Sequence, residues 1–347
     1  MTHAPSTAES ELRTPGDSSP DAPHGASGEA IRAVPVRHYW RWVGAIAALL
    51  LAAAVIRLFV LSPNIDWDAV REFLTVHRIL AGLRLTIIYT ILSMALAIFL
   101  AVLMAVMRMS VNPVLSTISW LYIWLFRGTP ALLQILFWFN IGLVIPKLWI
   151  GIPFTDFFLE ADTNRVITTS VAAVLALGVC EGAYLAEIVR AGIQSVEFGQ
   201  TEAALALGMK RSLAFRRIIL PQAMRAIIPP TGNEFIGMLK TTSLVSVIAA
   251  RELMTEAQNI AAQNFLTIEL LIVAASWYLL VTTVMTVGQF YIERYYARGS
   301  SNRDLPPTPI QRMRTSFRRL LAPGGRPAGG LGATGPGGVD TIGGRPS

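Results

Sequence analysis

One stretch of the chain decides the fold, and it reads EAALALGMKRSLAFRRIILP over residues 202–221. Its first residues predict a short helix, because alanine has the highest helix propensity. Gly208 then permits a turn or a close backbone approach, and a basic amphipathic segment follows that is expected to end at Pro221. Small alanines allow another surface to come close, while Glu202 offers one charge that fixes the position of that surface. The stretch therefore predicts a rigid knob that a soluble partner can push or pull.

The composition places this stretch in a membrane protein. Of the 347 residues, 53% are hydrophobic and only 15% are charged, whereas about 25% of the residues of a soluble domain carry a charge. The hydrophobic residues are clustered in runs near the ~20 residues that cross a bilayer as a helix. The sequence therefore argues against a soluble globular protein and against a disordered one, and it predicts an all-α polytopic membrane protein.

Six hydrophobic runs are candidates for membrane spans. The third is interrupted by Arg127-Gly128-Thr129-Pro130, the fourth contains Glu181, and the fifth is polar for a membrane helix. A cleavable signal peptide is the alternative for the first run, but its basic region would be unusually long and no clean cleavage site follows it. The runs cover residues 42–61, 85–107, 118–145, 166–186, 229–250 and 270–290.

Basic residues in the short loops give the orientation, since cytoplasmic loops carry an excess of Lys and Arg. Arginines precede the first run, six basic residues lie between the fourth and fifth runs, and more arginines follow the sixth. We therefore expect the 202–221 stretch and both termini in the cytoplasm. The net charge of +7 is explained by this arrangement, so nucleic acid is not an expected partner.

The two ends of the chain are low in complexity. Residues 1–38 are rich in Ser, Pro, Ala and Gly, and residues 296–347 are basic and rich in Gly and Pro. Such segments bury too little apolar surface to offset the entropy of ordering, so both are expected to be disordered cytoplasmic arms. The second arm is either solvated or in contact with membrane lipid headgroups. Between the arms, residues 39–61 form the first predicted helix and residues 62–295 the rest of the membrane domain.

The residue inventory excludes several kinds of chemistry. Cys180 is the only cysteine, so the chain has no intrachain disulfide and no cysteine cluster for a metal. All four histidines lie in the N-terminal quarter, which leaves none in the later spans for metal binding or hydrolysis. An intramembrane enzyme that uses Glu181 and Glu187 as an acid–base pair is one rival class. A purely structural scaffold is another.

The 202–221 stretch resembles the EAA loop of the permease subunits of ABC importers. The resemblance rests on Glu-Ala-Ala, a Gly four residues after the second Ala, and a later Ile-x-Leu-Pro. Three further blocks narrow it to the polar amino acid permeases of the histidine/glutamine branch. They are RGTP at 127–130 with Gln134, GAYLAEIVRAGI at 182–193, and the segment 229–244, and together they cover about residues 82–295. The positions that the resemblance makes candidates for coupling to an ATPase are Glu202, Ala203, Ala204, Gly208, Ile218, Leu220 and Pro221.

The resemblance also implies a fold, a transport function and partners. Its core has five membrane helices with a coupling loop at about 197–222, so the helix at 39–61 is an addition. It implies import of polar amino acids across the bacterial plasma membrane, with an opine or a small amine as the alternative solute. Such permeases act in pairs, as a homodimer or a heterodimer, and an extracytoplasmic binding protein delivers the amino acid.

Each such permease also meets a separate ATP-binding subunit. The chain has no G-x-x-x-x-G-K-[ST] phosphate loop. ATP and Mg are therefore expected on that partner, and this chain is expected to be non-catalytic, with no cofactor or metal of its own.

An amino acid that crosses as a zwitterion needs polar partners, because an unpaired charge in a low dielectric is costly. Glu181 and Lys240 are the first candidates, although they can equally pair with each other or with a neighbouring subunit. Similar permeases often have an acidic or amide residue where this chain has Thr241. Its absence weakens the case for a strongly cationic substrate, unless Glu181 supplies the carboxylate. The candidate pathway residues are Glu181, Tyr184, Asn233, Lys240, Thr242 and Ser243.

Residues 127–130 are the candidate gate hinge. Pro130 removes a helix hydrogen bond and Gly128 loosens the same turn, so the third span is expected to bend or break there. The freed backbone groups are within reach of Thr129 or Arg127. One interpretation is a gate that moves between inward-facing and outward-facing states. The other is that Arg127 marks the cytoplasmic border of the membrane and a helix simply starts at Pro130.

Overall fold

The computed structural model describes residues 39–151 and 158–297. The disordered arms were expected over 1–38 and 296–347. Residues 1–38 and 298–347 lie outside the described residues, whereas residues 296 and 297 belong to a helix. Contacts divide the chain into two compact units, residues 1–54 with 317–347 and residues 55–316. Helix α1 (Tyr39–Val60) begins in the first unit and ends in the second, which holds the other described elements.

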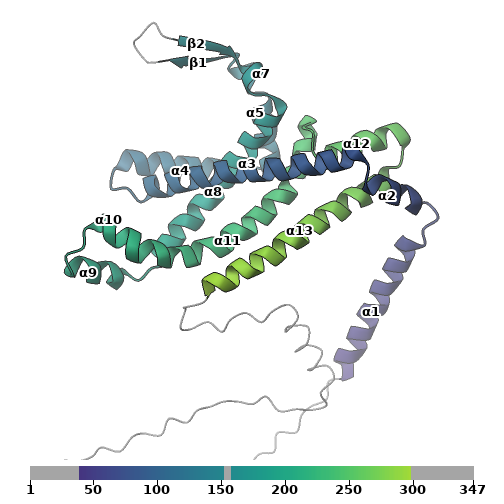
Figure 1. Ribbon diagram of the computed structural model, residues 1–347, viewed down its shortest axis with the longest axis horizontal. Coiled ribbons are helices and arrows are strands. Elements are labelled where there is room, and N and C mark those ends of the chain that lie inside the picture. The colour runs from purple at the N-terminus through teal and green to yellow at the C-terminus, as the bar shows by residue number, and fades with distance from the viewer. Residues whose placement is uncertain (1–38, 152–157, 298–347) are drawn as a thin grey trace, which may run out of the picture. The chain divides into compact units, whose positions relative to one another are not determined.

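Helices make up almost all of the described part of the second unit, as Figure 1 shows. Two of its helical segments are not α-helices: η1 is a π-helix and η2 is a 3₁₀-helix. The elements after α1 are, in chain order, α2 (Trp67–Leu74), α3 (His77–Arg108), α4 (Pro113–Gly128), α5 (Ala131–Phe139), α6 (Ile141–Val144), β1 (Lys147–Gly151), β2 (Phe158–Asp162), α7 (Thr163–Val166), α8 (Thr169–Gln194), α9 (Phe198–Ala206), α10 (Arg211–Ala214), η1 (Phe215–Ile219), α11 (Leu220–Thr241), η2 (Thr242–Ile248), α12 (Leu253–Asn264) and α13 (Thr267–Ala297).

Four of the described helices, α1, α3, α8 and α13, are long and apolar enough to cross a bilayer. Helices α4 and α5 provide a fifth span if this bent pair is counted as one. These spans match five of the six expected runs, and the chain is an all-helical polytopic membrane protein. The remaining run corresponds to α11, which carries Asn233, Glu234 and Lys240 and is too polar to belong to the set.

The centre of the second unit is the contact between α3 and α8, and small residues make it close. Ala97 and Ala101 on α3 and Ala176 on α8 are at most 1% exposed. A Cβ atom added at Gly182 of α8 would lie only 3.0 Å from the Cβ of Leu100 on α3. In lipid the hydrophobic effect contributes little to the association of helices, so close packing of small residues is a main source of the attraction between them. Helix α8 also contacts α4, α5 and α11 and thereby joins the bundle together.

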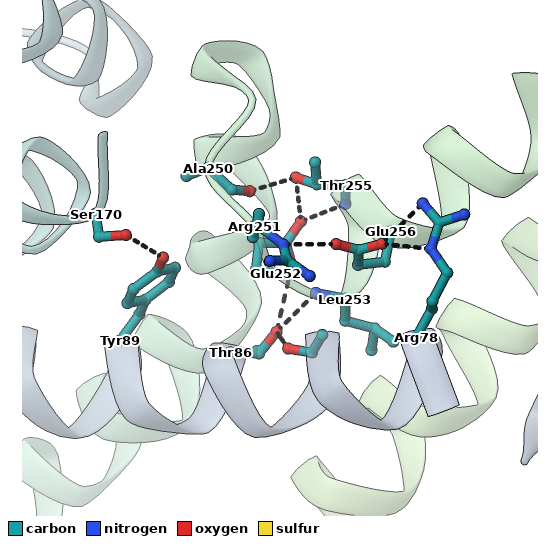
Figure 2. Close-up of polar contacts among 11 residues, drawn as sticks. Arg78, Thr86, Tyr89, Ser170, Ala250, Arg251, Glu252, Leu253, Thr255 and Glu256 are labelled. Carbon is teal, nitrogen blue, oxygen red and sulfur yellow. Dashed lines mark hydrogen bonds and ion pairs between the residues drawn. The ribbon is translucent and has the colours of Figure 1, made fainter. Parts of the chain in front are cut away.

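Helix α12 is held against its neighbours by a buried glutamate (Figure 2). Glu252 is fully buried and caps α12 by accepting hydrogen bonds from the N–H and hydroxyl of Thr255, at 2.7 and 3.1 Å. The Tyr278 hydroxyl on α13 donates to the other carboxylate oxygen at 2.8 Å. The Thr86 hydroxyl oxygen on α3 accepts the N–H of Leu253 at 3.0 Å. Three helices therefore share one buried polar network.

A second carboxylate, one turn along α12, is paired with two arginines. Glu256 is buried, and its oxygens lie 3.1 Å from Arg78 on α3 and 3.1 Å from Arg251. Figure 2 shows the two guanidinium groups on opposite sides of this carboxylate. Because a buried charge needs such partners, these ion pairs fix α12 to the first turn of α3.

A short antiparallel sheet departs from the all-α expectation. Strands β1 and β2 pair from Lys147↔Asp162 to Gly151↔Phe158. The third run was expected to continue as a helix to residue 145, whereas α5 ends before that residue and α6 adds a single turn. Aromatic and β-branched residues next to that position favour strand over helix. Glu160 forms an ion pair with Lys147 across the sheet, and this hydrogen bond raises the pKa of Lys147.

The fifth expected span starts earlier than residue 229, because α11 runs straight through Pro229 and Pro230. Each proline removes one backbone donor. Side chains reinforce this part of the helix: the Thr231 hydroxyl donates to the Ile227 carbonyl at 2.8 Å, and the Gln289 amide of α13 donates to the Pro229 carbonyl at 2.7 Å. The 3₁₀-helix η2 then carries the chain to the expected end of the span.

We expect Gly82→Ala to weaken the contact between α3 and α12. An added Cβ would lie 3.0 Å from the Glu252 carbonyl oxygen and 3.0 Å from Leu253 Cα, and these backbone atoms cannot rotate away. The expected loss is about 1–3 kcal/mol in the free energy of unfolding, measured as a lower melting temperature of the protein in detergent. Gly288→Ala on α13 is the matched control, because no atom lies within 4 Å of its added Cβ. Equal melting temperatures for the two variants would contradict this account.

Candidate functional site

The coupling loop, residues 197–222, begins with helix α9 and turns at Gly208. Gly208 has φ +77°, a backbone conformation that residues with a Cβ rarely adopt. Its N–H donates to the Leu205 carbonyl at 2.9 Å, and the Met209 N–H donates to the Ala204 carbonyl at 3.1 Å. These two bonds close the end of α9 as a Schellman motif. The structure therefore has the turn that Gly208 was expected to allow.

Pro221 does not end the second half of the coupling loop, contrary to expectation. The chain is helical without a break through α10, η1 and α11. In the π-helix η1 the hydrogen bonds span one residue more than in an α-helix. Pro221 follows η1 directly, as the second residue of α11, inside this continuous helix. One continuous helix therefore joins the coupling loop to the polar residues of α11.

The outward surface of the coupling loop is partly apolar. Phe198 and Leu207 are 74% and 82% exposed, and large exposed apolar side chains are typical of protein contact surfaces. Glu202 and Ala203 are also exposed. Ala204, by contrast, is buried, so its small size serves packing within the loop itself. The remaining motif residues, Ile218, Leu220 and Pro221, are half-buried or exposed.

The third span breaks at the candidate hinge. Helices α4 and α5 are bent by 105° across Thr129 and Pro130. The side-chain amide of Gln134 on α5 donates to the Phe126 carbonyl at 2.9 Å and to the Thr129 hydroxyl oxygen at 2.9 Å. The break that Pro130 predicted is present. Gln134, which the sequence offered only as part of a motif, is the residue that bridges it.

Arg127 connects the candidate hinge to the candidate pathway. Its guanidinium carbon lies 5.3 Å from the centre of the Tyr184 ring, within the range of a cation–π contact. Tyr184 lies one turn after Glu181 on α8 and is 38% exposed. The sequence assigned Arg127 and Tyr184 to separate sites, and only the packing of α4 against α8 brings them together.

Two carboxyl groups lie on neighbouring faces of α8 and α11. Glu181 of α8 and Glu234 of α11 are near enough to interact electrostatically, since the two helices pack against each other. One oxygen of Glu181 is buried and has no hydrogen-bond partner among the described residues. Glu234 was missed as a site residue, although a second carboxylate in a candidate span was a visible signal. The sequence does not show how α8 is aligned against α11, and this alignment is what brings Glu181 and Glu234 near each other.

The other candidate pathway residues do not all lie on one free surface. Asn233 and Lys240 are exposed, and within the described part of the chain no ion pair joins Lys240 to Glu181. Thr242 is fully buried and its hydroxyl donates to the Leu239 carbonyl at 2.6 Å. The Ser243 hydroxyl donates to the Lys240 carbonyl at 2.7 Å. Thr242 therefore stabilises the start of η2 from inside the packing.

Glu187 and Cys180, the other reactive groups of α8, are occupied by neighbours. The Arg190 guanidinium donates to Glu187 Oε2 through Nη2 at 2.6 Å and through Nε at 3.0 Å. Glu187 is therefore held in an ion pair and not in contact with Glu181 as an acid–base pair would require. Cys180 is buried, with its sulfur 3.9 Å from the Phe126 carbonyl oxygen.

Known proteins share this sequence over most of its length. Residues 97–298 match the family described as binding-protein-dependent transport system inner membrane component. The chain is 45% identical over 278 residues to the arginine transport system permease protein ArgU of Corynebacterium glutamicum, which covers 80% of this chain and 86% of that protein. It is 32% identical over 229 residues to the glutamine transport system permease protein GlnP of Escherichia coli strain K12, which covers 66% of this chain and 96% of that protein.

A solved structure supports the same assignment. The crystal structure of an amino acid ABC transporter with histidines aligns with a TM-score of 0.57 and 32% identity, over 67% of this chain and 99% of that chain. The helical bundle described above is therefore the ABC importer permease fold. The chain belongs to the family of binding-protein-dependent transport system inner membrane components, as a non-catalytic permease of a polar amino acid ABC transporter.

Proposed function

We propose that the coupling loop is the surface through which a separate ATP-binding subunit drives this permease, while a polar amino acid crosses beside α8 and α11. The observation that carries the proposal is the unbroken helix that runs from α10 through η1 to the end of α11. Exposed Phe198 and Leu207 lie on the loop side of this helix, and Glu234 lies on its membrane side. A continuous helix transmits displacement along its axis, so movement of the loop reaches the polar part of α11.

The charge distribution supports a cytoplasmic coupling loop. Six basic residues lie from the last turns of α8 to the second turn of α11, which is the part expected inside the cell. With that orientation, the two termini are cytoplasmic as well. The sheet β1–β2 and helix α12 then face the other side of the membrane, where the binding protein delivers the amino acid.

The pathway is completed by a second permease protomer. Tyr184, Asn233 and Lys240 are exposed on the single chain. A lysine that faces lipid in a membrane helix is costly, so such side chains normally face a protein interior or a water-filled path. A second copy of this chain, or a second permease of the same kind, would cover them.

The solute is one of the polar amino acids. The relatives named for arginine and for glutamine transport support an amino acid, and an opine or a small amine is the alternative. Uptake of radiolabelled amino acids by a strain that lacks the gene, with and without the gene restored, separates these possibilities.

The break between α4 and α5 is the proposed gate hinge. At this break the side-chain amide of Gln134 donates to the Thr129 carbonyl at 3.2 Å and to the Thr129 hydroxyl oxygen at 2.9 Å. The contact of Arg127 with Tyr184 links this hinge to the helix that carries Glu181. A change in the hinge angle would therefore reach the pathway directly.

Replacement of Gly208 by valine is expected to lower ATP-driven amino acid uptake at least about tenfold, because a β-branched residue at φ +77° costs on the order of 1–3 kcal/mol. Uptake is measured in proteoliposomes that contain this chain, its ATP-binding subunit and the binding protein. Gly199→Val is the matched control, since no atom lies within 4 Å of its added Cβ and its φ is not positive. Normal uptake by Gly208→Val, or an equal loss in both variants, argues against a rigid coupling turn.

A cysteine at position 207 is expected to crosslink to the ATP-binding subunit, because Leu207 is 82% exposed on the coupling loop. Leu143→Cys on α6 is the control: Leu143 is 83% exposed but lies on the side proposed to face away from the cytoplasm. The native Cys180 is buried and does not compete. The products are identified by mass spectrometry. A crosslink from position 143 and none from position 207 would reverse the proposed orientation.

Loss of the aromatic ring at position 184 is expected to slow uptake about threefold, the effect of one partly exposed cation–π contact of about 0.5–1 kcal/mol. Tyr184→Leu removes the contact with Arg127 and Tyr184→Phe keeps it. The control is Tyr291→Leu on α13, which removes an exposed ring (65%) outside the candidate pathway. Initial uptake rates of the three variants are compared. If Tyr184→Phe is as slow as Tyr184→Leu, the phenol oxygen and not the ring is what matters.

A further inference from the structure

Helix α12 lies between two residues with left-handed backbone. Ala249, four residues before it, has φ 54°, and Phe265, directly after it, has φ 62°. Residues with a Cβ rarely adopt this conformation, and such strain persists only where the surrounding contacts hold it. Strained positions of this kind are common in segments that move. The contacts that keep α12 in place therefore decide whether the strain at both of its ends is kept or relieved.

Two carboxyl groups hold α12, and their surroundings differ. Glu256 has two arginine partners, Arg78 of α3 and Arg251, each at 3.1 Å. Glu252 is 0% exposed and forms no ion pair with any residue that the structure describes. The titratable group that α13 brings to Glu252 is the Tyr278 hydroxyl at 2.8 Å, and η2 has no charged residue. An ionised carboxylate buried without a cation is costly.

The hydrogen bonds around Glu252 have room for one further proton. Figure 2 shows Thr86 and Thr255 on opposite sides of this residue. The Thr255 hydroxyl lies 2.6 Å from the Ala250 carbonyl oxygen and 3.1 Å from Glu252, and the Thr86 hydroxyl lies 3.1 Å from the Gly82 carbonyl oxygen and 3.3 Å from Glu252. Each hydroxyl has one proton to donate, and in both cases the carbonyl oxygen is the nearer acceptor. A proton on Glu252 gives one of these threonine oxygens a hydrogen bond to accept.

We propose that Glu252 is a neutral carboxylic acid while α12 is docked, and that loss of its proton releases α12 from α3 and α13. Residues 249–265 then form a proton-controlled latch, with the left-handed residues at its two ends as hinges. The latch depends neither on the solute nor on the ATP-binding subunit. Only its side of the membrane, the extracytoplasmic one, rests on the proposed orientation.

The direction of the pH dependence follows from the burial of Glu252. Burial raises the pKa of Glu252, and exposure to water on release returns this pKa toward the ordinary glutamate value. The docked helix therefore keeps the proton at pH values where the released helix loses it. Docking is strongest at low pH and weakens as the pH rises through the raised value. The ratio of docked to released helix changes about tenfold for each pH unit over which the docked state holds one proton more.

The test is amide hydrogen exchange of residues 253–264, read by mass spectrometry from pH 6 to pH 9 and corrected for the intrinsic rise of exchange with pH. The protein is the full chain in complex with its ATP-binding subunit in lipid nanodiscs, so that both faces meet the same buffer. Protection of α12 in the wild-type complex is expected to fall at least about tenfold over this range, while that of α8 stays constant. Glu252→Gln keeps a donor and an acceptor and cannot ionise. Its α12 is expected to stay as protected at pH 9 as at pH 6.

Glu256→Gln is the matched control, with the same substitution one turn along the same helix. It leaves Arg78 and Arg251 without their shared carboxylate, so protection of α12 is expected to be lower than in the wild type at every pH. The fall between pH 6 and pH 9 is expected to remain, because Glu252 is still present.

Infrared spectroscopy reads the protonation of Glu252 directly. The difference between the spectra of the wild type and Glu252→Gln is expected to contain the carbonyl band of a neutral carboxylic acid at pH 6, and this band is expected to weaken toward pH 9.

Four results overturn the proposal: constant or rising protection of α12 in the wild type, a fall that persists in Glu252→Gln, absence of the neutral-acid band at pH 6, or failure of Glu252→Gln to fold. The last result counts against the proposal because a neutral acid is replaced by a neutral amide of nearly the same shape, so protection of α8 in that variant is expected to equal that of the wild type.

Discussion

The close approach of α3 and α8 is the constraint on which the rest of the structure depends. Leu96 of α3 fills the space beside Gly178, where an added Cβ would lie only 2.7 Å away from it. Because the two helices meet over alanine and glycine, α8 lies in the centre of the bundle, and its other faces meet α4, α5 and α11. The ring of Tyr184 and the carboxylate of Glu181 are therefore placed by residues that have no polar chemistry of their own.

Irregular backbone in this bundle occurs where a side chain from another turn or helix supports it. Gln134 bridges the break between α4 and α5, and Gln289 donates to α11 beside Pro229. Glu252 caps α12 at the point where η2 ends and the chain turns. In lipid, each exposed backbone group that lacks a partner costs several kcal/mol. These polar side chains of the membrane helices thus support the backbone at the places where regular helix hydrogen bonding is interrupted.

Local signals in the sequence predicted much of this architecture. Five of the six hydrophobic runs are candidate spans in the structure, the chain breaks at Pro130, and Gly208 turns with positive φ. Each of these depends on residues within a few positions of one another. The same local reasoning was wrong about Pro221, because the π-helix that accommodates it leaves no clear composition signal.

Contacts between distant segments could not be predicted from the sequence. The contact of Arg127 with Tyr184 and the proximity of Glu181 to Glu234 depend on how helices rotate against one another, which small buried residues decide. Ala204 is a similar case, since a buried and an exposed alanine look alike in a motif. The strand pair β1–β2 was missed because an aromatic, apolar segment next to a membrane helix suits either conformation.

The π-helical turn η1 limits how chimeras between this permease and another can be built. Because that turn holds one residue more than an α-helical turn, the side chains before and after it are out of phase by about 100°. A helical wheel drawn without interruption from α10 into α11 therefore assigns residues to the wrong face. A graft between two permeases keeps both halves in their orientation only when it includes the whole of η1. Within that limit, the coupling loop and the polar part of α11 can be exchanged between permeases one at a time.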